Sequence, residues 1–479
     1  MLNGDVVFAV VAIAVFLVEL FGIIAAIHAI IHTRTAQGAI AWGIFLVLLP
    51  WLALILYGIF GRNKFKGYVS LRSLKNKSIR PVIDACIDEG VEKKLFREEL
   101  TTFDRVLTRL ASLPITRFNK CQLLVDGDTT FRSIFNGIAS AKEYILVQFY
   151  IIKNDQLGRE LKTRLIQKAK DRVKVYFLYD EIGSFQLPSS YIQEMKDEGI
   201  EIFAFHTTKG KANHFQFNFR NHRKIVVVDG KIAYGGGCNV GDEYVSKHPK
   251  FGSWRDTHVQ IEGPAVKQIQ YCFIQDWYWA TTRIPELNWK LEKAKNGREE
   301  TLIIASGPAD NLETCSLMFI HAIHMARERF WIASPYFIPD MQILSALKLA
   351  VLKGVDVRIL MPEKPDHRTI HLASFSFYEN TIPFGIKLYR YTEGFMHQKV
   401  FLVDSVCAAV GTANLDNRSF RLNFEFTILN FDSSFIQQVE NLLHEDFSRS
   451  RLVALAEFTQ RSFFFKLAAR SAKLLAPVL

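Results

Sequence analysis

A set of five residues occurs twice in this chain at the same spacing. The first copy is His222, Lys224, Asp229, Gly236 and Asn239, and the second copy is His397, Lys399, Asp404, Gly411 and Asn414. Average residue usage makes such a set rare by chance, so two equal copies indicate an internal duplication. Any fold of this chain must therefore contain two equivalent halves, each presenting the same polar groups.

The segments around the two copies repeat as well. Short apolar runs separated by charged stretches precede each copy, in the same order: "YILVQFYII" (144–152), "VKVYFLYD" (173–180) and "GIEIFAF" (199–205), then "FWIASPYFI" (330–338), "VDVRILMP" (355–362) and "GIKLYRY" (385–391). Strands that alternate with helices predict parallel βαβ units. We therefore expect an α/β fold in which two α/β/α halves, 116–295 and 296–479, pack around one shared active site, with a juxtamembrane linker over 62–115.

The N-terminus has a different composition. Residues 6–31 are apolar apart from Glu19 and His28, and residues 39–60 carry no charge, although Pro50 interrupts them. About 20 apolar residues suffice to cross a bilayer, so we predict a two-helix transmembrane anchor over 1–61. Glu19 would be a costly carboxylate inside the membrane, and it either serves the site, is protonated or pairs with a neighbouring helix.

Basic residues follow the second apolar stretch, whereas the connector between the two stretches contains only Arg34. The positive-inside rule therefore places the large C-terminal part in the cytoplasm, at the cell membrane. The net charge of +11 favours an anionic partner such as a lipid surface. The six cysteines are scattered and lack zinc-like spacing, so no metal site is expected.

Each copy of the repeated set can handle a phosphate group. The histidine and the lysine lie two residues apart and so face one side of a strand, while Arg223 and Gln398 between them face away. An imidazole can serve as nucleophile or as general acid and base, and the lysine is a cation for a phosphate oxygen. The glycine permits close backbone approach, the asparagine adds a neutral donor, and the aspartate orients other groups. One copy supplies half a site, and two facing copies supply a complete one.

The paired HxKxxxxD segments, followed by "GGCN" and "GTAN", resemble the phospholipase D superfamily. Within it, "RTAQGAIAW", "SWRDTHVQIEGPAV", "ASPYFIPD" and "NLDNRSFRLNFE" are similar to bacterial cardiolipin synthases, and the similarity covers essentially the whole chain. The resemblance implies that a histidine attacks phosphatidylglycerol, releases glycerol and forms a phosphohistidine, from which a second phosphatidylglycerol takes the phosphatidyl group to give cardiolipin. It implies no metal and no other cofactor.

The resemblance also implies residue roles. The histidines, lysines and aspartates of both copies are the expected catalytic residues, and the glycines, the asparagines and Glu425 are expected to bind substrate. Trp254, Arg255 and Asp256 either support the site or form a structural salt bridge. We expect His222 to be the nucleophile and His397 the general acid, because the basic segment between Ile202 and Val228 contains no acidic residue and its positive potential keeps His222 neutral. The resemblance implies the same roles, since related enzymes usually attack with the histidine of the first motif.

Other readings remain open. A phosphatidyltransferase or phospholipase of the same superfamily would use serine or water as the acceptor. A nuclease would share the motifs but would not need membrane spans, so no nucleic acid partner is expected. The basic C-terminal stretch that begins "SRSRLVALAEFTQRSFFF" fits either an amphipathic helix on anionic lipid or an ordinary terminal helix. Oligomers are possible, and the acyl-chain preference is not encoded in any visible motif.

Overall fold

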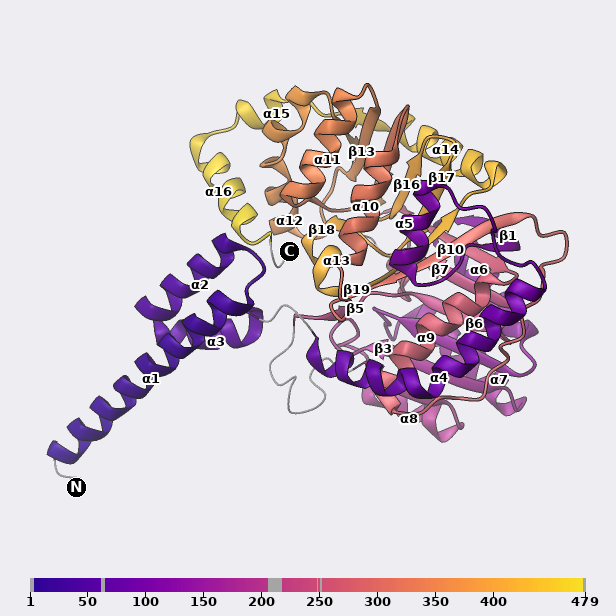
Figure 1. Cartoon of the computed structure of the whole chain (residues 1–479), viewed down its shortest axis with the longest axis horizontal. Coiled ribbons are helices and arrows are strands. Elements are labelled where there is room, and N and C mark those ends of the chain that lie inside the picture. The colour runs from indigo at the N-terminus through magenta and orange to yellow at the C-terminus, as the bar shows by residue number, and fades with distance from the viewer. Residues whose placement is uncertain (1–3, 62–64, 206–217, 248, 250–251, 477–479) are drawn as a thin grey trace. The chain divides into compact units, whose positions relative to one another are not determined.

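The computed structural model describes residues 4–61, 65–205, 218–247, 249 and 252–476 (Figure 1). The chain divides into two compact units, each described here by itself. The smaller unit comprises residues 1–70 and 207–219, and the larger comprises residues 71–206 and 220–479.

Three apolar helices follow one another in the smaller unit: α1 (Gly4–His32), α2 (Ala36–Leu48) and α3 (Pro50–Phe60). Within α1, the stretch Val6–His32 is long and apolar enough to cross a membrane. The continuous helix expected over 39–60 is instead two helices that separate at Leu49, with Pro50 as the first residue of α3. Proline has no N–H to donate and is favoured at a helix start, which explains the break.

Small residues bring the three helices close together. A Cβ on Gly22 of α1 would lie 2.6 Å from the Leu46 carbonyl oxygen and 2.7 Å from Pro50 Cβ. His28 Nδ1 of α1 and the Tyr57 hydroxyl of α3 are 2.9 Å apart. Close approach at small residues is typical of helices that associate inside a membrane. Glu19 lies exposed on α1.

The larger unit is built on one mixed sheet. The first-half strands are β1 (Thr116–Val125), β2 (Tyr144–Phe149), β3 (Lys174–Asp180), β4 (Glu201–Phe205), β6 (Ile225–Val228), β7 (Ile232–Gly236) and β9 (Thr257–Glu262). The second-half strands are β10 (Glu299–Ser306), β11 (Arg329–Ala333), β13 (Asp356–Pro362), β14 (Lys387–Tyr391), β16 (Val400–Val403), β17 (Cys407–Gly411) and β19 (Asn423–Asn430). The order is β4-β3-β2-β6-β7-β9-β1 in the first half and β14-β13-β11-β16-β17-β19-β10 in the second, with β20 (Ser450–Leu452) beside β14. The two halves therefore share one topology.

The predicted parallel units are confirmed. β2, β3 and β4 pair in parallel in the first half, and β11, β13 and β14 do so in the second. The strands that follow each motif pair antiparallel to their neighbours. β1 pairs antiparallel with β10, with Thr116 opposite Thr301, so the two sheets meet edge to edge. The duplication is therefore a pair of halves in one continuous sheet.

Helices pack against the sheet in each half (Figure 1). The first half contains α6 (Asp126–Ser140), α7 (Gln156–Lys170), α8 (Ser189–Asp197) and α9 (Ala265–Thr281). The second half contains α10 (Thr314–Met325), α11 (Met341–Leu352), α12 (Arg368–Phe375), α13 (Asn417–Arg421), α14 (Ser433–Ser448), α15 (Ala456–Thr459) and α16 (Phe463–Leu474). The segment 62–115 contains α4 (Lys66–Glu92) and α5 (Thr102–Ala111). Phe103 and Leu107 of α5 join the core of the second half, so this segment does more than link.

Three two-residue strands take part in pairings between the halves. β5 (Arg220–Asn221) pairs in parallel with β19, and β15 (Phe395–Met396) pairs in parallel with β8 (Trp254–Arg255). β5 and β15 come directly before the first residues of the two repeated sets. Each motif therefore enters the site along a strand of the opposite half.

Candidate active site

The backbone of each motif histidine is fixed by the other half. His222 N–H donates to the Phe424 carbonyl over 2.9 Å, and His397 N–H donates to the Arg255 carbonyl over 2.8 Å. The sequence predicted that each histidine lies on a strand, but β6 and β16 begin at Ile225 and Val400, just after the lysines. The histidines and lysines therefore occupy the short segments between the crossing strands and the main sheet.

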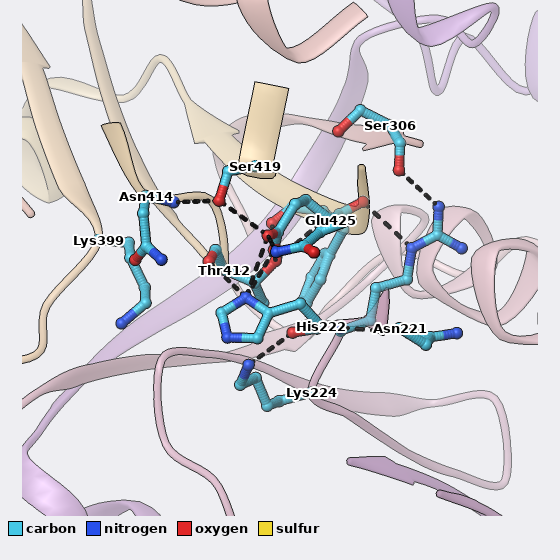
Figure 2. Close-up of polar contacts among 12 residues, drawn as sticks. Asn221, His222, Lys224, Ser306, Lys399, Thr412, Asn414, Ser419 and Glu425 are labelled. Atoms are coloured by element: carbon cyan, nitrogen blue, oxygen red, sulfur yellow. Dashed lines mark hydrogen bonds and ion pairs between the residues drawn. The ribbon is translucent and has the colours of Figure 1, made fainter. Parts of the chain in front are cut away.

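A carboxylate from the opposite half holds each imidazole. His222 Nδ1 lies 2.9 Å from Glu425 Oε2, as Figure 2 shows, and 3.1 Å from the Thr412 carbonyl oxygen. His397 Nδ1 lies 2.8 Å from Asp256 Oδ2. With Nδ1 turned to a carboxylate, Nε2 is the ring nitrogen that points away from it and is suited to chemistry. Each half thus completes the histidine of the other.

The two carboxylates differ in their surroundings. Glu425 also accepts hydrogen bonds from Ser419 Oγ over 2.9 Å and from Asn423 Nδ2 over 3.1 Å (Figure 2). Burial would raise the pKa of Glu425, but His222 and the other donors outweigh it and lower that pKa. In Asp256 burial dominates, and the pKa is raised despite the nearby Lys399. Glu425 is therefore the more firmly ionised of the pair.

The two motif lysines are buried beside the histidines. Lys224 Nζ donates to the His222 carbonyl over 2.6 Å (Figure 2), and Lys399 Nζ donates to the His397 carbonyl. Burial lowers the pKa of Lys224 well below its usual value, and it lowers the pKa of Lys399 to about 8. An anionic phosphate between these two cations would compensate their lost hydration.

Both imidazoles are neutral near pH 7. Burial lowers the pKa of His222 to about 4, because the lowering by burial and Lys224 exceeds the raising by Glu425. Burial also lowers the pKa of His397 well below its usual value, with Lys399 adding to the effect. A neutral imidazole is the nucleophilic form, so either histidine could attack as the site stands.

The motif aspartates lie at the far ends of β6 and β16 from the histidines. Asp229 and Asp404 adopt φ values of +51° and +48°. Their side chains accept backbone N–H bonds of 2.8 to 2.9 Å at the starts of β2 and β11, from Lys142, Glu143 and Tyr144 and from Arg327, Glu328 and Arg329. The structure therefore does not bring these aspartates together with the histidines.

The motif glycines allow neighbouring strands to approach. A Cβ on Gly236 would lie 2.5 Å from the Thr257 carbonyl oxygen, and one on Gly411 would lie 2.6 Å from the Phe426 carbonyl oxygen. Contacts this short are not tolerated, so a larger residue would displace the strand that carries the supporting carboxylate of its half. The sequence predicted that these glycines allow a close backbone approach, and the backbones that approach them are those of β9 and β19.

The motif asparagines sit at the edge of the same space. Asn239 Nδ2 donates to the Tyr244 hydroxyl over 2.8 Å, and its Oδ1 accepts from Ile151 N–H over 3.1 Å. Asn414 lies near Lys399 in Figure 2, and its backbone N–H donates to Ser419 Oγ over 3.0 Å. Both asparagines are therefore buried and anchored, and Asn414 lies beside Lys399.

The residues between histidine and lysine face away, as predicted. Arg223 forms an ion pair with Asp276 of α9, with nitrogen–oxygen distances of 2.8 and 2.9 Å. Gln398 Nε2 donates to Asp446 of α14 over 2.9 Å, and Arg255 Nε donates to the same carboxyl group over 2.8 Å. These contacts fasten each motif to a helix behind the site.

Sequence reasoning left open whether Asp256 supports the site or forms a structural salt bridge, and it did not identify the histidine that Asp256 contacts. Asp256 is the counterpart of Glu425, since both carboxylates hold a histidine of the opposite half. The available signal in each half was an acidic residue in, or directly before, the strand that pairs with the glycine-bearing strand of the motif, namely β9 in the first half and β19 in the second. The two residues lie at different distances from their motifs, because Asp242–Val245 and the turn after it lengthen the first half.

Comparisons with known proteins agree with a duplicated chain of two phospholipase D-like halves. A family model described as "Cardiolipin synthase, PLD-like domain" matches residues 134–277 and 319–447, and one described as "Phospholipase_D-nuclease N-terminal" matches residues 12–62. Cardiolipin synthase A of Pseudomonas putida strain F1 is 47% identical over 467 residues, covering 97% of each chain. Cardiolipin synthase A of Pseudomonas fluorescens strain Pf-5 is 46% identical over 468 residues, covering 97% of each chain.

A solved structure shows the same fold. Phosphatidylserine synthase of Haemophilus influenzae Rd KW20 superposes with a TM-score of 0.59 at 17% identity, covering 79% of this chain and 100% of that one. At this level of sequence identity, the comparison supports the fold alone. The sequence relatives and the family models together decide the assignment: the chain belongs to the cardiolipin synthase family of PLD-like proteins.

Proposed function

We propose that this protein is a phosphatidyltransferase that makes cardiolipin and glycerol from two molecules of phosphatidylglycerol. The observation that carries the proposal is the pair of buried imidazoles, each oriented through Nδ1 by a carboxylate of the other half and each beside a buried lysine. Two cations can hold one phosphodiester between two imidazoles. Such a site splits one difficult transfer into two steps.

The first step is attack by His222. The anionic phosphodiester, once bound beside His397, favours the protonated form of that imidazole. A bond then forms between His222 Nε2 and phosphorus as the bond from phosphorus to the glycerol oxygen breaks, and protonated His397 gives that oxygen its proton. In the second step, His397 takes the proton of a hydroxyl on the second phosphatidylglycerol. That oxygen bonds to phosphorus, and the phosphorus–nitrogen bond breaks. The lysines stabilise the negative charge that builds on the phosphoryl oxygens.

The unequal carboxylates support this division of roles. Positive charge builds on the attacking imidazole, and the firmly ionised Glu425 is suited to stabilise it. The general acid must surrender its proton, and a more weakly ionised Asp256 makes His397 the stronger acid. The basic segment ahead of His222 that suggested the same assignment includes residues 206–217, which lie outside the described residues.

We further propose roles for the remaining motif residues. Lys224 and Lys399 bind the phosphoryl oxygens, and Asn239 and Asn414 line the same space. Asp229 and Asp404 act as positioning residues, because they fix the strand starts next to β6 and β16. Gly236, Gly411 and Glu425 keep the strands and the first imidazole in place rather than contact substrate directly.

The proposed domain boundaries follow the same logic. We assign residues 1–61 to a membrane anchor and 62–115 to a juxtamembrane segment. We assign 116–295 and 296–479 to the two halves, because β1 begins at Thr116 and β10 at Glu299.

The protein acts at the cell membrane in this proposal. α1 forms one crossing, and α2 with α3 forms the second, so that the catalytic halves stay in the cytoplasm. Deleting residues 1–61 should release part of the protein from membranes and leave measurable transfer in mixed micelles. A folded but wholly inactive truncation would instead show that the anchor, and Glu19 in particular, contributes to the site.

The C-terminal helix supplies a second membrane contact. Exposed apolar side chains lie on α16, including Phe463 at 72% and Phe464 at 78% exposure, and Leu467 and Leu474 join them. Basic residues accompany this face: Arg461, Lys466, Arg470 and Lys473. An amphipathic helix with this composition lies on anionic lipid, which is the kind of surface that holds phosphatidylglycerol.

The deciding experiment uses the purified full-length protein with phosphatidylglycerol as the only lipid in detergent. Equal amounts of cardiolipin and glycerol are expected. Phosphatidic acid without cardiolipin would show a phospholipase that uses water. Phosphatidylserine formed in preference to cardiolipin when serine is added would show a different phosphatidyltransferase. Either result would overturn the proposal.

A further inference from the structure

The tyrosines that follow the first strand of each half have partners of opposite charge. Tyr150 of the first half is hydrogen-bonded through its hydroxyl to Arg220. Tyr336 of the second half donates its hydroxyl proton to Asp366 Oδ2. The two tyrosines occupy equivalent places in the duplication, so this difference separates a cationic side of the site from an acidic side.

A small pocket opens on the acidic side. It is open to solvent, the space within it and across its mouth together amounts to about 270 Å³, and its polar lining includes Tyr336, Asp366, His367, His371 and Arg390. Asp366 is only 18% exposed in its side chain. Arg390 is buried and donates to the Tyr378 hydroxyl over 2.7 Å and to the Pro362 carbonyl over 2.9 Å. The carboxylate and the guanidinium give the pocket both acceptors and donors, with little net charge.

The pocket adjoins the paired motifs. β12 (Phe337–Ile338) pairs in parallel with β18 (Leu415–Asp416), with Phe337 opposite Leu415, so Tyr336 lies level with Asn414. Burial lowers the pKa of His397 and of Lys399, and the Asp366 carboxylate counteracts that lowering in both. The acidic side of the site is therefore close to the general acid and to one phosphate-binding lysine.

Asn414 offers a further acceptor at this border. Its side-chain nitrogen is hydrogen-bonded to Asp416. Its Oδ1 is buried, and none of the residues that the structure describes donates a hydrogen bond to it. In the first half, the corresponding oxygen of Asn239 accepts from Ile151 N–H. A buried acceptor without a donor is costly, and a hydroxyl group of a bound molecule would satisfy it.

We propose that the pocket formed by Tyr336, Asp366, His367, His371 and Arg390 binds the glycerol headgroup of phosphatidylglycerol. The inference rests on the proposed function and names the part of the site that recognises the alcohol. The Asp366 carboxylate and Asn414 Oδ1 accept hydrogen bonds from hydroxyl groups. The Arg390 guanidinium offsets the charge of Asp366, so the pocket has little net attraction for the ammonium group of an ethanolamine or serine headgroup. The phosphate remains between Lys224 and Lys399, because the carboxylate repels it from the pocket.

The subsite defines a direction across the site. Glycerol leaves from, or enters at, the side where His397 can protonate its oxygen or remove its proton. His222 then faces the opposite side of phosphorus, as an in-line displacement requires. The position of the pocket therefore agrees with the assignment of His397 as the general acid. His397 is not among the residues that line the pocket.

The test measures glycerol binding apart from histidine attack. Full-length wild type, Asp366→Asn and Tyr336→Phe are given labelled glycerol and phosphatidylglycerol, and the KM for glycerol in the exchange reaction is measured. The same proteins are given a phosphatidyl ester of p-nitrophenol, whose release reports attack at phosphorus. Loss of one charged hydrogen bond should raise the KM for glycerol about tenfold in Asp366→Asn. The ratio of glycerol exchange to nitrophenol release should fall by a similar factor.

The control is Asp356→Asn, which removes a carboxylate from the start of β13 where it pairs with Lys387. It should keep the wild-type KM for glycerol. An unchanged KM in both Asp366→Asn and Tyr336→Phe would overturn the subsite. So would a variant that loses exchange of ethanolamine rather than of glycerol. Wild type that releases nitrophenol but forms neither cardiolipin nor labelled phosphatidylglycerol would instead overturn the proposed function.

Discussion

The two copies of the motif have the same backbone and different electrostatic surroundings. In both, a crossing strand carries the histidine into the other half, and a carboxylate there holds Nδ1. Glu425 accepts hydrogen bonds from the side-chain hydroxyls of Thr412 and Ser419, whereas Asp256 accepts from the Thr257 N–H over 2.9 Å and from the Trp254 indole over 3.4 Å. The duplication therefore produced two copies with the same backbone arrangement. Differences among the neighbouring residues give the two histidines different electrostatic surroundings.

Removing either histidine should have the largest effect and should separate the two roles. His222→Ala and His397→Ala should each lose at least about a thousandfold in turnover, as variants lacking a nucleophile or its proton-transfer partner do. With a nitrophenol leaving group, His397→Ala should accumulate phosphatidyl-enzyme, because that step needs little help from an acid. His222→Ala should accumulate none. Mass spectrometry that finds the phosphoryl group on His397 would reverse the assignment.

Neutralising the two carboxylates should have the next largest effect. Glu425→Gln and Asp256→Asn should each reduce turnover by roughly 10²- to 10⁴-fold, since an amide cannot stabilise a charged imidazole. Glu425→Gln should slow formation of the phosphatidyl-enzyme with every leaving group. Asp256→Asn should slow it mainly when the leaving group is glycerol. If both variants depended on the leaving group in the same way, the two carboxylates would not have different roles. Glu194→Gln, which changes an exposed carboxylate, serves as the control.

The pH profile should sharpen the comparison further. Because the pKa of His222 is lowered to about 4, its neutral form is present above that pH, and kcat/KM should fall only below it. As the pH rises, the proton on His397 and the positive charges on Lys224 and Lys399 are all lost, because burial lowers the pKa of each group. The pKa of Lys399 is lowered to about 8, so kcat/KM should have fallen by that pH. Lys399→Arg should move the alkaline limb upward, since a guanidinium stays protonated. A rate that rises steadily from pH 5 to 10 would contradict this pairing of groups.

Chelation should have the smallest effect. The lysines of the two copies lie where a metal ion would otherwise neutralise a phosphate, so EDTA should leave turnover unchanged. Activity that disappears in EDTA and returns with one particular divalent ion would show that the two copies are not sufficient by themselves.

Much of the fold was predictable because the duplication repeats its strands with its motifs. The parallel units and the outward orientation of Arg223 and Gln398 followed from strand periodicity. The exchange of carboxylates was not predictable, because Asp256 and Glu425 lie at unequal distances from their motifs and act on the opposite half. The proline at position 50 was visible in the sequence. Whether it would kink one helix or separate two helices depends on packing against α1, which the sequence did not reveal.

The reciprocal support of the histidines also bears on how the protein is made. The ribosome completes the first half, with His222 and Lys224, well before it reaches Glu425. Until that residue is translated and β19 joins β5, nothing in the second half holds the first imidazole, and Asp256 has no histidine to support. A chain that ends before Glu425 therefore lacks the carboxylate that orients the imidazole of His222. A complete pair of supported histidines therefore requires translation to pass Glu425 and the two halves to fold together.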